Sequence, residues 1–271
     1  MKLSIITVNL NNREGLQKTI DSVIAQTFKD FEWIVIDGGS TDGSKELIEQ
    51  YADHFAYWVS EPDKGIYNAM NKGIKVAKGE YLQFLNSGDW IHDKEVLQDV
   101  FSSNRDADII YCDYEFYVNG QLFSTERTPS DLRLSYLVNH WLGHSVSFIK
   151  QHLFDENPYD ESYHIVSDWK FFIQQALLGR TFQHFSRIVS CMDDTGISVT
   201  NQALVQQERN SIMASIVPQC IKNDTNEYNR LTGDRKLMEI KRYKDDCWCY
   251  RKLILAALRI IRFLDSFRRR K

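Results

Sequence analysis

Apolar, strand-like runs alternate with helix-like segments along the first 90 residues, and this alternation constrains the fold more than any other feature of the sequence. Runs of large apolar residues that end in polar turns predict buried strands at 3–8, 31–36, 55–60 and 81–85. Apolar residues at helical spacing predict helices at 13–26, at 66–77 and in a segment that ends near Tyr51. Strands and helices that alternate through short polar connections predict an α/β fold, with a doubly wound, mostly parallel central sheet flanked by helices.

A different pattern follows residue 90. Residues 109–123 alternate between apolar and polar side chains as in a β-hairpin, with Asn119-Gly120 at its turn. Further elements are expected as helices at about 130–139 and 167–178 and as an extended segment at 182–192. From about residue 203 the sequence is polar-rich and compatible with helix. The predicted organisation is one domain over 1–202, with halves at 1–90 and 91–202, and a helical C-terminal extension over 203–271.

The formal net charge of −4 is unevenly distributed along the chain. Residues 251–271 carry eight Lys or Arg and one Asp, which gives +7, so residues 1–250 carry −11. An acidic body does not suit binding to a phosphate backbone, and we expect no nucleic-acid partner. The tail, in contrast, has the charge to bind an anionic surface.

Cysteine usage and hydropathy indicate the cellular compartment. The five cysteines are scattered and fit neither a disulfide nor a zinc framework. The apolar run at the N-terminus is too short for a signal peptide, and no segment reaches the length of a transmembrane helix. We therefore expect a cytoplasmic protein.

The predicted strand at 81–85 runs directly into the tight polar turn Asn86-Ser87-Gly88-Asp89. Asp89 is thereby placed at the carboxyl end of a buried strand, where open α/β sheets bind ligands. A carboxylate at this place can hold a hard cation against a diphosphate. An ordinary Asn/Gly/Asp turn is the structural alternative.

Polar side chains also lie at the ends of the first two strands, Thr7 and Asn9 at the first and Asp37 at the second. The turn after the first strand is neither a Gly-x-Gly-x-x-Gly fingerprint nor a phosphate-binding P-loop. A nucleotide would therefore be held by side chains at the strand ends, and Asp37 could accept hydrogen bonds from a base or ribose. Capping of the Gly-Gly-Ser-Thr turn is the alternative role of Asp37.

Three segments in order, LSIITVN (3–9), WIVIDGGSTDGS (33–44) and YLQFLNSGD (81–89), resemble the successive signatures of family 2 glycosyltransferases. These enzymes have the GT-A fold. The segment EPDKGIYNAMNKG (61–73) is typical of bacterial members that build exopolysaccharide, capsule or O-antigen repeats, and is similar to the colanic-acid transferases. The resemblance covers about residues 1–90 strongly and 140–200 more loosely, and makes 1–90 the nucleotide-binding half and 91–202 the acceptor half.

The resemblance implies a set of ligand-binding residues. Those expected to bind the nucleotide sugar are Thr7, Asn9, Asp37, Asp63, Lys64, Gly65, Asn71, Asn86 and Ser87. The chain departs from the family where Asn86-Ser87-Gly88 replaces the usual Asp-x-Asp, so a divalent cation, Mg²⁺ or Mn²⁺, would rest chiefly on Asp89. Met70 stands where many relatives have Arg, and Lys64 or Lys72 could supply the missing positive charge.

On the acceptor side, Asp168 resembles the family's catalytic base and lies at the start of a predicted helix. A helix N-terminus stabilises the carboxylate form, which is ready to take a proton; an N-cap role is the alternative. The resemblance places His144 near the acceptor or the diphosphate. Trp141 and Trp169 could stack on sugar faces on the acceptor side, and a place in the core is the alternative for both. His140 and His144 are four apart, but no carboxylate completes a local zinc site.

The function implied is transfer of a sugar from a nucleotide-diphosphate sugar to a hydroxyl of a saccharide acceptor, with inversion at the anomeric carbon. UDP is the first expectation for the donor nucleotide and GDP the second. The implied setting is cell-surface polysaccharide synthesis on a lipid-linked acceptor, peripherally at the inner face of the bacterial cell membrane. The alternative is a non-catalytic sugar-nucleotide-binding or assembly protein derived from such an enzyme.

Residues 251–271 predict a basic amphipathic helix. One face at helical spacing consists of Leu253, Ala257, Ile260, Ile261, Leu264 and Phe267. The stretch is too short and too charged to span a bilayer but suits a helix that lies in the plane of an anionic leaflet. Each basic residue there contributes roughly 1 kcal/mol. A C-terminal helix that packs on the body, with a solvated basic end, is the alternative.

Deletion of residues 251–271 is expected to release the protein from anionic liposomes without unfolding the body, because the binding charge and apolar face are removed together. Sedimentation with liposomes and circular dichroism measure the two effects. Equal sedimentation of the truncated and intact chains, or no binding of the intact chain, would assign the tail a structural role.

Overall fold

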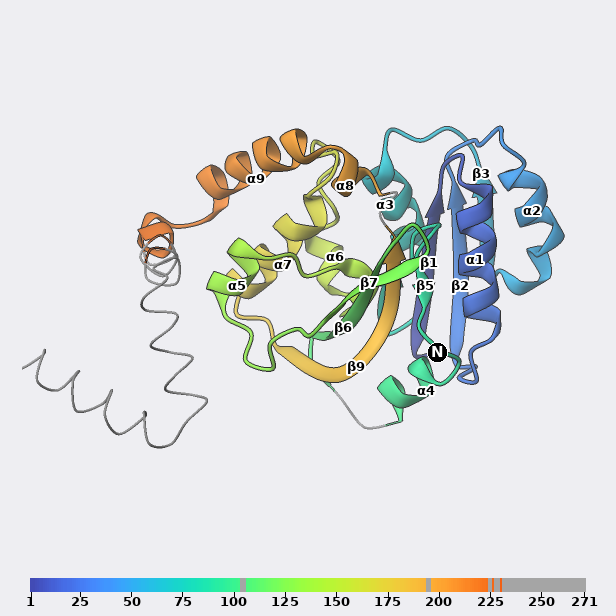
Figure 1. The fold of residues 1–271 in the computed structure, drawn as a ribbon, viewed down its shortest axis with the longest axis horizontal. Coiled ribbons are helices and arrows are strands. Elements are labelled where there is room, and N and C mark those ends of the chain that lie inside the picture. Colours follow the sequence, from blue (N-terminus) through green and yellow to red (C-terminus); the bar gives the residue numbers. More distant parts are fainter. Residues whose placement is uncertain (103–105, 194–195, 224–225, 227–229, 231–271) are drawn as a thin grey trace, which may run out of the picture. The chain divides into compact units, whose positions relative to one another are not determined.

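The computed structural model describes residues 1–102, 106–193, 196–223, 226 and 230 (Figure 1). The elements of the first half are β1 (Leu3–Asn9), α1 (Arg13–Ile24), β2 (Phe31–Asp37), α2 (Ser44–Gln50), η1 (Ala52–His54), β3 (Tyr57–Ser60), α3 (Ile66–Val76) and β4 (Tyr81–Phe84). This order confirms the strands and helices predicted for the first 90 residues.

The second half of the chain contains the remaining described helices and strands. They are β5 (Trp90–Ile91), α4 (Val96–Phe101), β6 (Ile109–Val118), β7 (Gln121–Glu126), α5 (Leu134–Asn139), η2 (His144–Val146), β8 (Ser147–Lys150), α6 (Leu153–Glu156), α7 (Ser167–Leu177), β9 (Phe182–Asp193), α8 (Ile197–Thr200) and α9 (Gln202–Ile216). The hairpin, the helix at 167–178 and the extended segment at 182–192 are confirmed. The short elements α4, β5, β8 and α6 were not predicted.

Within the described part of the chain the strands form one nine-stranded sheet, in the order β3-β2-β1-β4-β8-β6-β9-β5 with β7 beside β6. The pairs β1–β2, β1–β4 and β2–β3 are parallel. In the second half β8 runs antiparallel to β4 and β6, and β6 pairs in parallel with β9. The parallel pairing brings Asn9 and Asp37 opposite each other at the carboxyl ends of their strands. The fold is thus the predicted α/β sheet flanked by helices.

The β6–β7 hairpin turns at Asn119 and Gly120, which both have positive φ angles of 51° and 73°. Two consecutive left-handed residues match the right-handed twist of the flanking strands, and Asn-Gly adopts that conformation most readily. The local sequence therefore sets the position of this turn.

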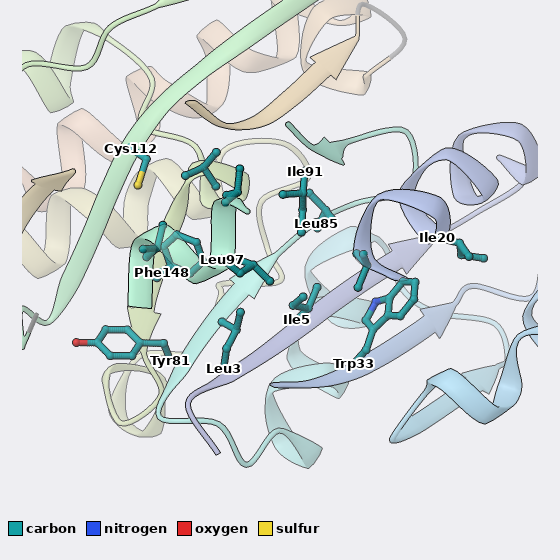
Figure 2. Packing of buried hydrophobic residues seen from close by; sticks show 14 of the residues in the cluster. Leu3, Ile5, Ile20, Trp33, Tyr81, Leu85, Ile91, Leu97, Cys112 and Phe148 are labelled. Carbon is teal, nitrogen blue, oxygen red and sulfur yellow. The ribbon is translucent and has the colours of Figure 1, made fainter. Parts of the chain in front are cut away.

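The main hydrophobic core lies between the sheet and helices α1, α2 and α4. Alternate residues of β1, Leu3 and Ile5, point into it with Trp33 of β2 and Leu85 after β4, and all are at most 2% exposed. Figure 2 shows these side chains with Ile20 of α1 and Leu97 of α4. Because side chains alternate across a strand, the same pattern leaves Ile6 and Phe84 on the opposite face.

The opposite face carries a cluster of aromatic rings beneath α3, α6 and α7. Phe84 packs edge-on against Phe154 and Tyr159, with ring centroids 5.7 and 5.2 Å apart. Phe154 also stacks on Phe171 of α7 at 4.6 Å. Helices on both faces cover the sheet, which explains why its central strands are apolar throughout.

Residues 1–216 form one compact unit, and residues 217–271 are assigned to a second. The first unit extends past residue 202 and includes α9. The boundary between domain and C-terminal extension that the sequence predicts at residue 202 stays a prediction. None of the helices in the described part of the chain is both long and apolar enough to cross a membrane. The amphipathic helix predicted at 251–271 lies outside the described residues.

Replacement of Gly79 by alanine is expected to lower the free energy of unfolding by about 1–3 kcal/mol. A Cβ at this position would lie 2.4 Å from the Ser4 nitrogen and 2.5 Å from the Leu3 carbonyl carbon, so the backbone of β1 would have to move. Urea denaturation followed by circular dichroism measures the change. The neighbouring Lys78→Ala, at an exposed position, is the matched control; equal stability of the two variants would contradict the tight approach.

Candidate active site

A cavity of about 1480 Å³ opens at the carboxyl ends of β1 and β4. Its walls come from the loops after β1 and β4, the start of α3, the β6–β7 hairpin, η2, α7, the end of β9 and helices α8 and α9. Residues from both predicted halves therefore face one space, which is large enough for a sizeable ligand.

Most of the residues expected to bind the nucleotide sugar line this cavity. They are Asn9, Asp63, Lys64, Gly65, Asn86 and Ser87, together with the predicted metal residue Asp89. Three other predicted residues are directed into the protein and do not line it: Thr7, Asp37 and Asn71.

These three inward-facing residues hold the framework of the site. Thr7 is fully buried, and its hydroxyl oxygen accepts a hydrogen bond from the Trp33 indole at 3.0 Å. The Asn71 amide donates to the Tyr159 carbonyl at 2.8 Å and to a Glu161 carboxylate oxygen at 2.9 Å. Asn71 thus joins α3 to the loop that precedes α7.

Asp37 caps the turn after β2. Its carboxylate accepts hydrogen bonds from the Ser40 N–H at 2.9 Å, the Ser60 hydroxyl at 2.6 Å and the Asn9 amide at 2.7 Å. Burial would raise the pKa of Asp37, but hydrogen bonds from Ser40, Ser60 and Asn9 outweigh it and hold the pKa below its usual value. The capping alternative is therefore present in the structure. Asn9 is the member of this network that reaches the cavity, and its Oδ1 atom is buried without a protein partner.

The turn 86–89 is held in place by hydrogen bonds to a residue of α1 that was not among the predicted site residues. The Thr19 hydroxyl of α1 donates to the Asp89 carbonyl oxygen at 2.7 Å and accepts from the Gly88 N–H at 3.1 Å. Gly88 has φ +104°, a backbone conformation that side chains with a Cβ rarely adopt. The turn is consequently fixed, and Asp89 is held at the cavity wall.

A second carboxylate lies near this turn. Asp193, at the end of β9, has its Oδ2 atom 3.9 Å from the position that a Cβ on Gly88 would occupy. Burial raises the pKa of Asp89 to about 7; His144 and Lys18 oppose the shift, and Asp193 adds to it. Asp193 thus brings negative charge to the place where the family's usual Asp-x-Asp would have a side chain. Its sequence signal was a carboxylate directly after the predicted extended segment 182–192, whereas Asp89 follows its strand by a turn of three residues.

Asp89 and Asp193 provide some, but not all, of the ligands that a divalent cation requires. Within the described ranges there is no group of three or more His, Cys, Asp or Glu that could hold a metal ion. Magnesium, however, is commonly bound by one or two carboxylates together with substrate phosphates. Asp89 and Asp193 provide two carboxylates, and a bound cation would relieve the repulsion between them. The phosphates of a diphosphate ligand would supply the remaining coordination.

Asp168 is the second residue of α7 and is buried, with 3% exposure. Its Oδ2 atom lies 2.9 Å from His144 Nδ1, and its Oδ1 atom lies 2.9 Å from the Tyr67 hydroxyl. Burial would raise the pKa of Asp168, but hydrogen bonding and charge from His144, and then the Tyr67 hydroxyl, lower it overall. Asp168 is therefore a carboxylate partnered by side chains and not the N-cap of its helix, which is Val166.

His144 also reaches the opposite wall. Its Nε2 atom lies 3.2 Å from the Asn86 amide nitrogen. The structure thus joins Asn86, His144 and Asp168, three of the predicted site residues, into one contact chain across the cavity.

The aromatic residues expected near an acceptor take different places. Trp169 is 1% exposed and donates its indole N–H to the Leu137 carbonyl oxygen at 2.6 Å. It does not line the cavity, whereas Trp141 does, beside Tyr114 at a centroid distance of 5.5 Å. His140 is exposed and stacks on Tyr136.

Helix α9 supplies two site residues that the sequence analysis missed. The Glu208 carboxylate accepts hydrogen bonds from the backbone N–H groups of His164 at 2.7 Å, Ile165 at 3.0 Å and Val166 at 3.2 Å. Glu208 thereby fixes the loop that leads into α7 and Asp168. The only sequence signal was a charged pair in a polar-rich helix, which is common on solvated surfaces.

Arg209 adjoins Glu208 and brings a positive charge into the cavity wall. Its guanidinium lies 4.9 Å from the centre of the Trp169 ring, and burial lowers its pKa while Asp168 opposes that shift. The two lysines named from the sequence differ: Lys64 lines the cavity, but Lys72 does not and pairs with Glu61 at 2.8 Å. Arg209 is therefore a further candidate for the positive charge that Met70 does not provide.

A model of the family described as glycosyl transferase family 2 matches residues 4–175. The chain belongs to this family. An uncharacterised glycosyltransferase of Mycobacterium tuberculosis is 33% identical over 202 residues, which cover 72% of this chain and 76% of that protein. The match confirms the resemblance drawn from the three ordered segments.

Two solved structures show the same fold. TarS 1–349 of Staphylococcus aureus in complex with UDP-GlcNAc has a TM-score of 0.65 at 19% identity, over 90% of this chain and 80% of that one. The mannosyltransferase PcManGT of Pyrobaculum calidifontis, in complex with GDP-Man and Mn²⁺, has a TM-score of 0.61 at 14% identity, over 96% and 80%. These similarities confirm the GT-A fold expected for a family 2 glycosyltransferase.

Asp89→Ala is expected to weaken metal-dependent binding of a nucleoside diphosphate by at least about tenfold, or about 1.4 kcal/mol. Among single carboxylate exchanges within residues 80–100 this effect should be the largest, because Asp89 is the carboxylate of that segment at the cavity wall. Calorimetric titration of UDP and of GDP, with and without Mn²⁺, measures it.

Glu80→Ala is the control for the Asp89 exchange, since Glu80 pairs with Lys2 away from the cavity. If Mn²⁺ changes neither binding nor turnover of the unmodified protein, the metal assignment is wrong. Lysine and arginine side chains such as Lys64 and Arg209 would then neutralise the diphosphate.

Proposed function

We propose that this family 2 glycosyltransferase moves a sugar from a nucleotide-diphosphate sugar to a hydroxyl of a saccharide acceptor, with inversion at the anomeric carbon. The observation that carries the proposal is that the turn 86–89 and Asp168 line the same cavity. One wall offers groups suited to a nucleotide diphosphate, and the facing wall offers a carboxylate suited to proton removal. Direct displacement requires both groups on opposite sides of the reacting carbon.

In this mechanism the acceptor hydroxyl attacks the anomeric carbon as the bond to the diphosphate breaks. Asp168 is the residue on which removal of the hydroxyl proton depends, and a general base of this kind contributes about 100- to 10,000-fold in rate. A divalent cation, when bound near Asp89, supplies positive charge that stabilises the departing diphosphate. Lys64 and Arg209 add fixed positive charge to the same space.

The donor nucleotide is proposed to be UDP in preference to GDP. TarS in its UDP-GlcNAc complex and PcManGT in its GDP-Man complex share the fold, so both nucleotides merit testing. The acceptor is proposed to be a lipid-linked saccharide of cell-surface polysaccharide synthesis. The basic segment 251–271 would then attach the enzyme peripherally to the inner face of the membrane.

A panel of nucleotide sugars tested by thermal shift, with and without Mn²⁺, examines this function directly. A ligand that binds the folded state raises the unfolding temperature in proportion to the logarithm of its concentration over its Kd. Stabilisation by one nucleotide sugar, followed by release of its labelled sugar to a saccharide or to water, is the expected result. Binding without any transfer or hydrolysis would favour the non-catalytic alternative, and no binding at all would contradict the proposal.

Asp168→Asn is expected to reduce transfer by about 100- to 10,000-fold while donor binding stays within a few-fold. The amide keeps the size of the side chain but cannot stabilise a proton taken from the acceptor. Labelled-donor turnover and calorimetric donor binding measure the two quantities. Asp160→Asn, at a position outside the cavity, is the control; near-normal turnover by Asp168→Asn would overturn its role.

A further inference from the structure

We propose that His144, held by Asp168, is the group that takes the proton from the attacking hydroxyl. Asp168 would then be a positioning residue, and His144 Nε2 the catalytic base. This inference rests on the proposed function and names the proton acceptor within the same site.

The contact between the two side chains carries the inference. His144 Nδ1 and Asp168 Oδ2 are 2.9 Å apart, and the residues are 9% and 3% exposed. They come from different elements, η2 and α7, and both line the cavity. A buried carboxylate at this distance holds an imidazole ring in one orientation, as in the aspartate–histidine pair of serine hydrolases.

The partners at the two ends of the ring point to one tautomer. A carboxylate can only accept, so Nδ1 carries the hydrogen that is donated to Asp168. At the other end, Nε2 lies 3.2 Å from the Asn86 amide nitrogen, which is a donor. Both contacts favour the neutral Nδ1–H form. Its Nε2 lone pair accepts from the Asn86 amide at a longer distance than either contact of Asp168, and the acceptor hydroxyl would take the place of that amide. His144 lines the same cavity as Asn86 and Asp89 of the nucleotide-side turn.

Asp168 itself is less suited to take the proton. Its Oδ2 atom accepts a hydrogen bond from His144. Its Oδ1 atom lies 2.9 Å from the Tyr67 hydroxyl oxygen, which also lies 2.6 Å from the Ile165 carbonyl oxygen. The single proton of the Tyr67 hydroxyl is therefore shared between these two acceptors. These partners and the N-terminus of α7 favour the ionised carboxylate, which weakens it as a base. A neutral imidazole with a lone pair on one nitrogen is the group that most often serves as a general base.

The proposed step balances in atoms and electrons. The acceptor oxygen forms a bond to the anomeric carbon while its proton moves to His144 Nε2. The bond from the anomeric carbon to the diphosphate oxygen breaks, and its electron pair stays on the diphosphate. The imidazolium formed is stabilised by the Asp168 carboxylate at Nδ1 and then returns its proton to water.

The tautomer of His144 can be measured without any assumption about activity. Multiple-bond ¹H–¹⁵N correlation spectra of the full, ¹⁵N-labelled chain distinguish protonated from unprotonated ring nitrogens, and the signals lost in His144→Gln assign the residue. The expected result at pH 7.5 is Nδ1–H with Nε2 unprotonated. Asp168→Asn should abolish this preference, whereas His140→Gln should leave it unchanged. An Nε2–H tautomer or a doubly protonated ring in the unmodified protein would overturn the proposal.

Hydrolysis of labelled UDP-GlcNAc, in which water takes the place of the acceptor, provides the kinetic test. His144→Ala is expected to lower kcat by about 100- to 10,000-fold with UDP binding within a few-fold. Added imidazole should restore part of the rate to His144→Ala and none to Asp168→Asn, because only the first variant lacks the ring. His140→Gln, outside the cavity, should retain the rate.

The outcomes separate this inference from the proposed function. Near-normal kcat in His144→Ala together with an inactive Asp168→Asn would make Asp168 the direct base, and the glycosyltransferase function would stand. If the unmodified protein binds no nucleotide sugar, the proposed function fails, and the tautomer measurement still decides whether Asp168 sets the state of His144. Circular dichroism of each variant identifies any loss of folding, in which case His144→Gln replaces His144→Ala.

Discussion

The parallel pairing of β1 with both β2 and β4 is the constraint on which the rest of the structure depends. It aligns Leu3 with Phe31 and Tyr81, so that three carboxyl ends meet at one edge of the sheet. Ladder hydrogen bonds and a core on both faces fix this register, because a shift of one residue would turn every apolar side chain to the wrong side. The cavity opens where these strands end, and its nucleotide-side wall follows from that register.

The facing wall is assembled from segments that have no such local constraint. Asp168 is held in place through its own partners, His144 and Tyr67, and through Glu208, which binds three backbone N–H groups ahead of α7. A buried carboxylate is costly unless hydrogen bonds satisfy it. The polar residues around Asp168 therefore stabilise the site and also determine which atom can exchange a proton.

The charge of the site is arranged differently from that of the family's usual sequence. Asn86 and Gly88 remove negative charge from the turn, while Asp193 returns a carboxylate from β9 beside Gly88. Arg209 of α9 brings positive charge to the cavity where Met70 of α3 provides none. Where the chain lacks the charged residues that are usual in the family, elements distant in the sequence therefore provide charges near the same positions. This arrangement is consistent with a site that binds a diphosphate.

The sequence by itself determined the strands of the first half, the Asn119-Gly120 turn and the positions of Asp89 and Asp168 at element ends, because periodicity and turn chemistry act over a few residues. It could not determine which strand-end side chains face the cavity: Thr7, Asp37, Asn71 and Trp169 face the interior, and their partners come from other elements. Only the tertiary structure brought His144, Asp168 and Tyr67 together, across sequence separations of 24 and 101 residues. Contacts over such distances depend on how whole elements pack, and no local pattern in the chain encodes them.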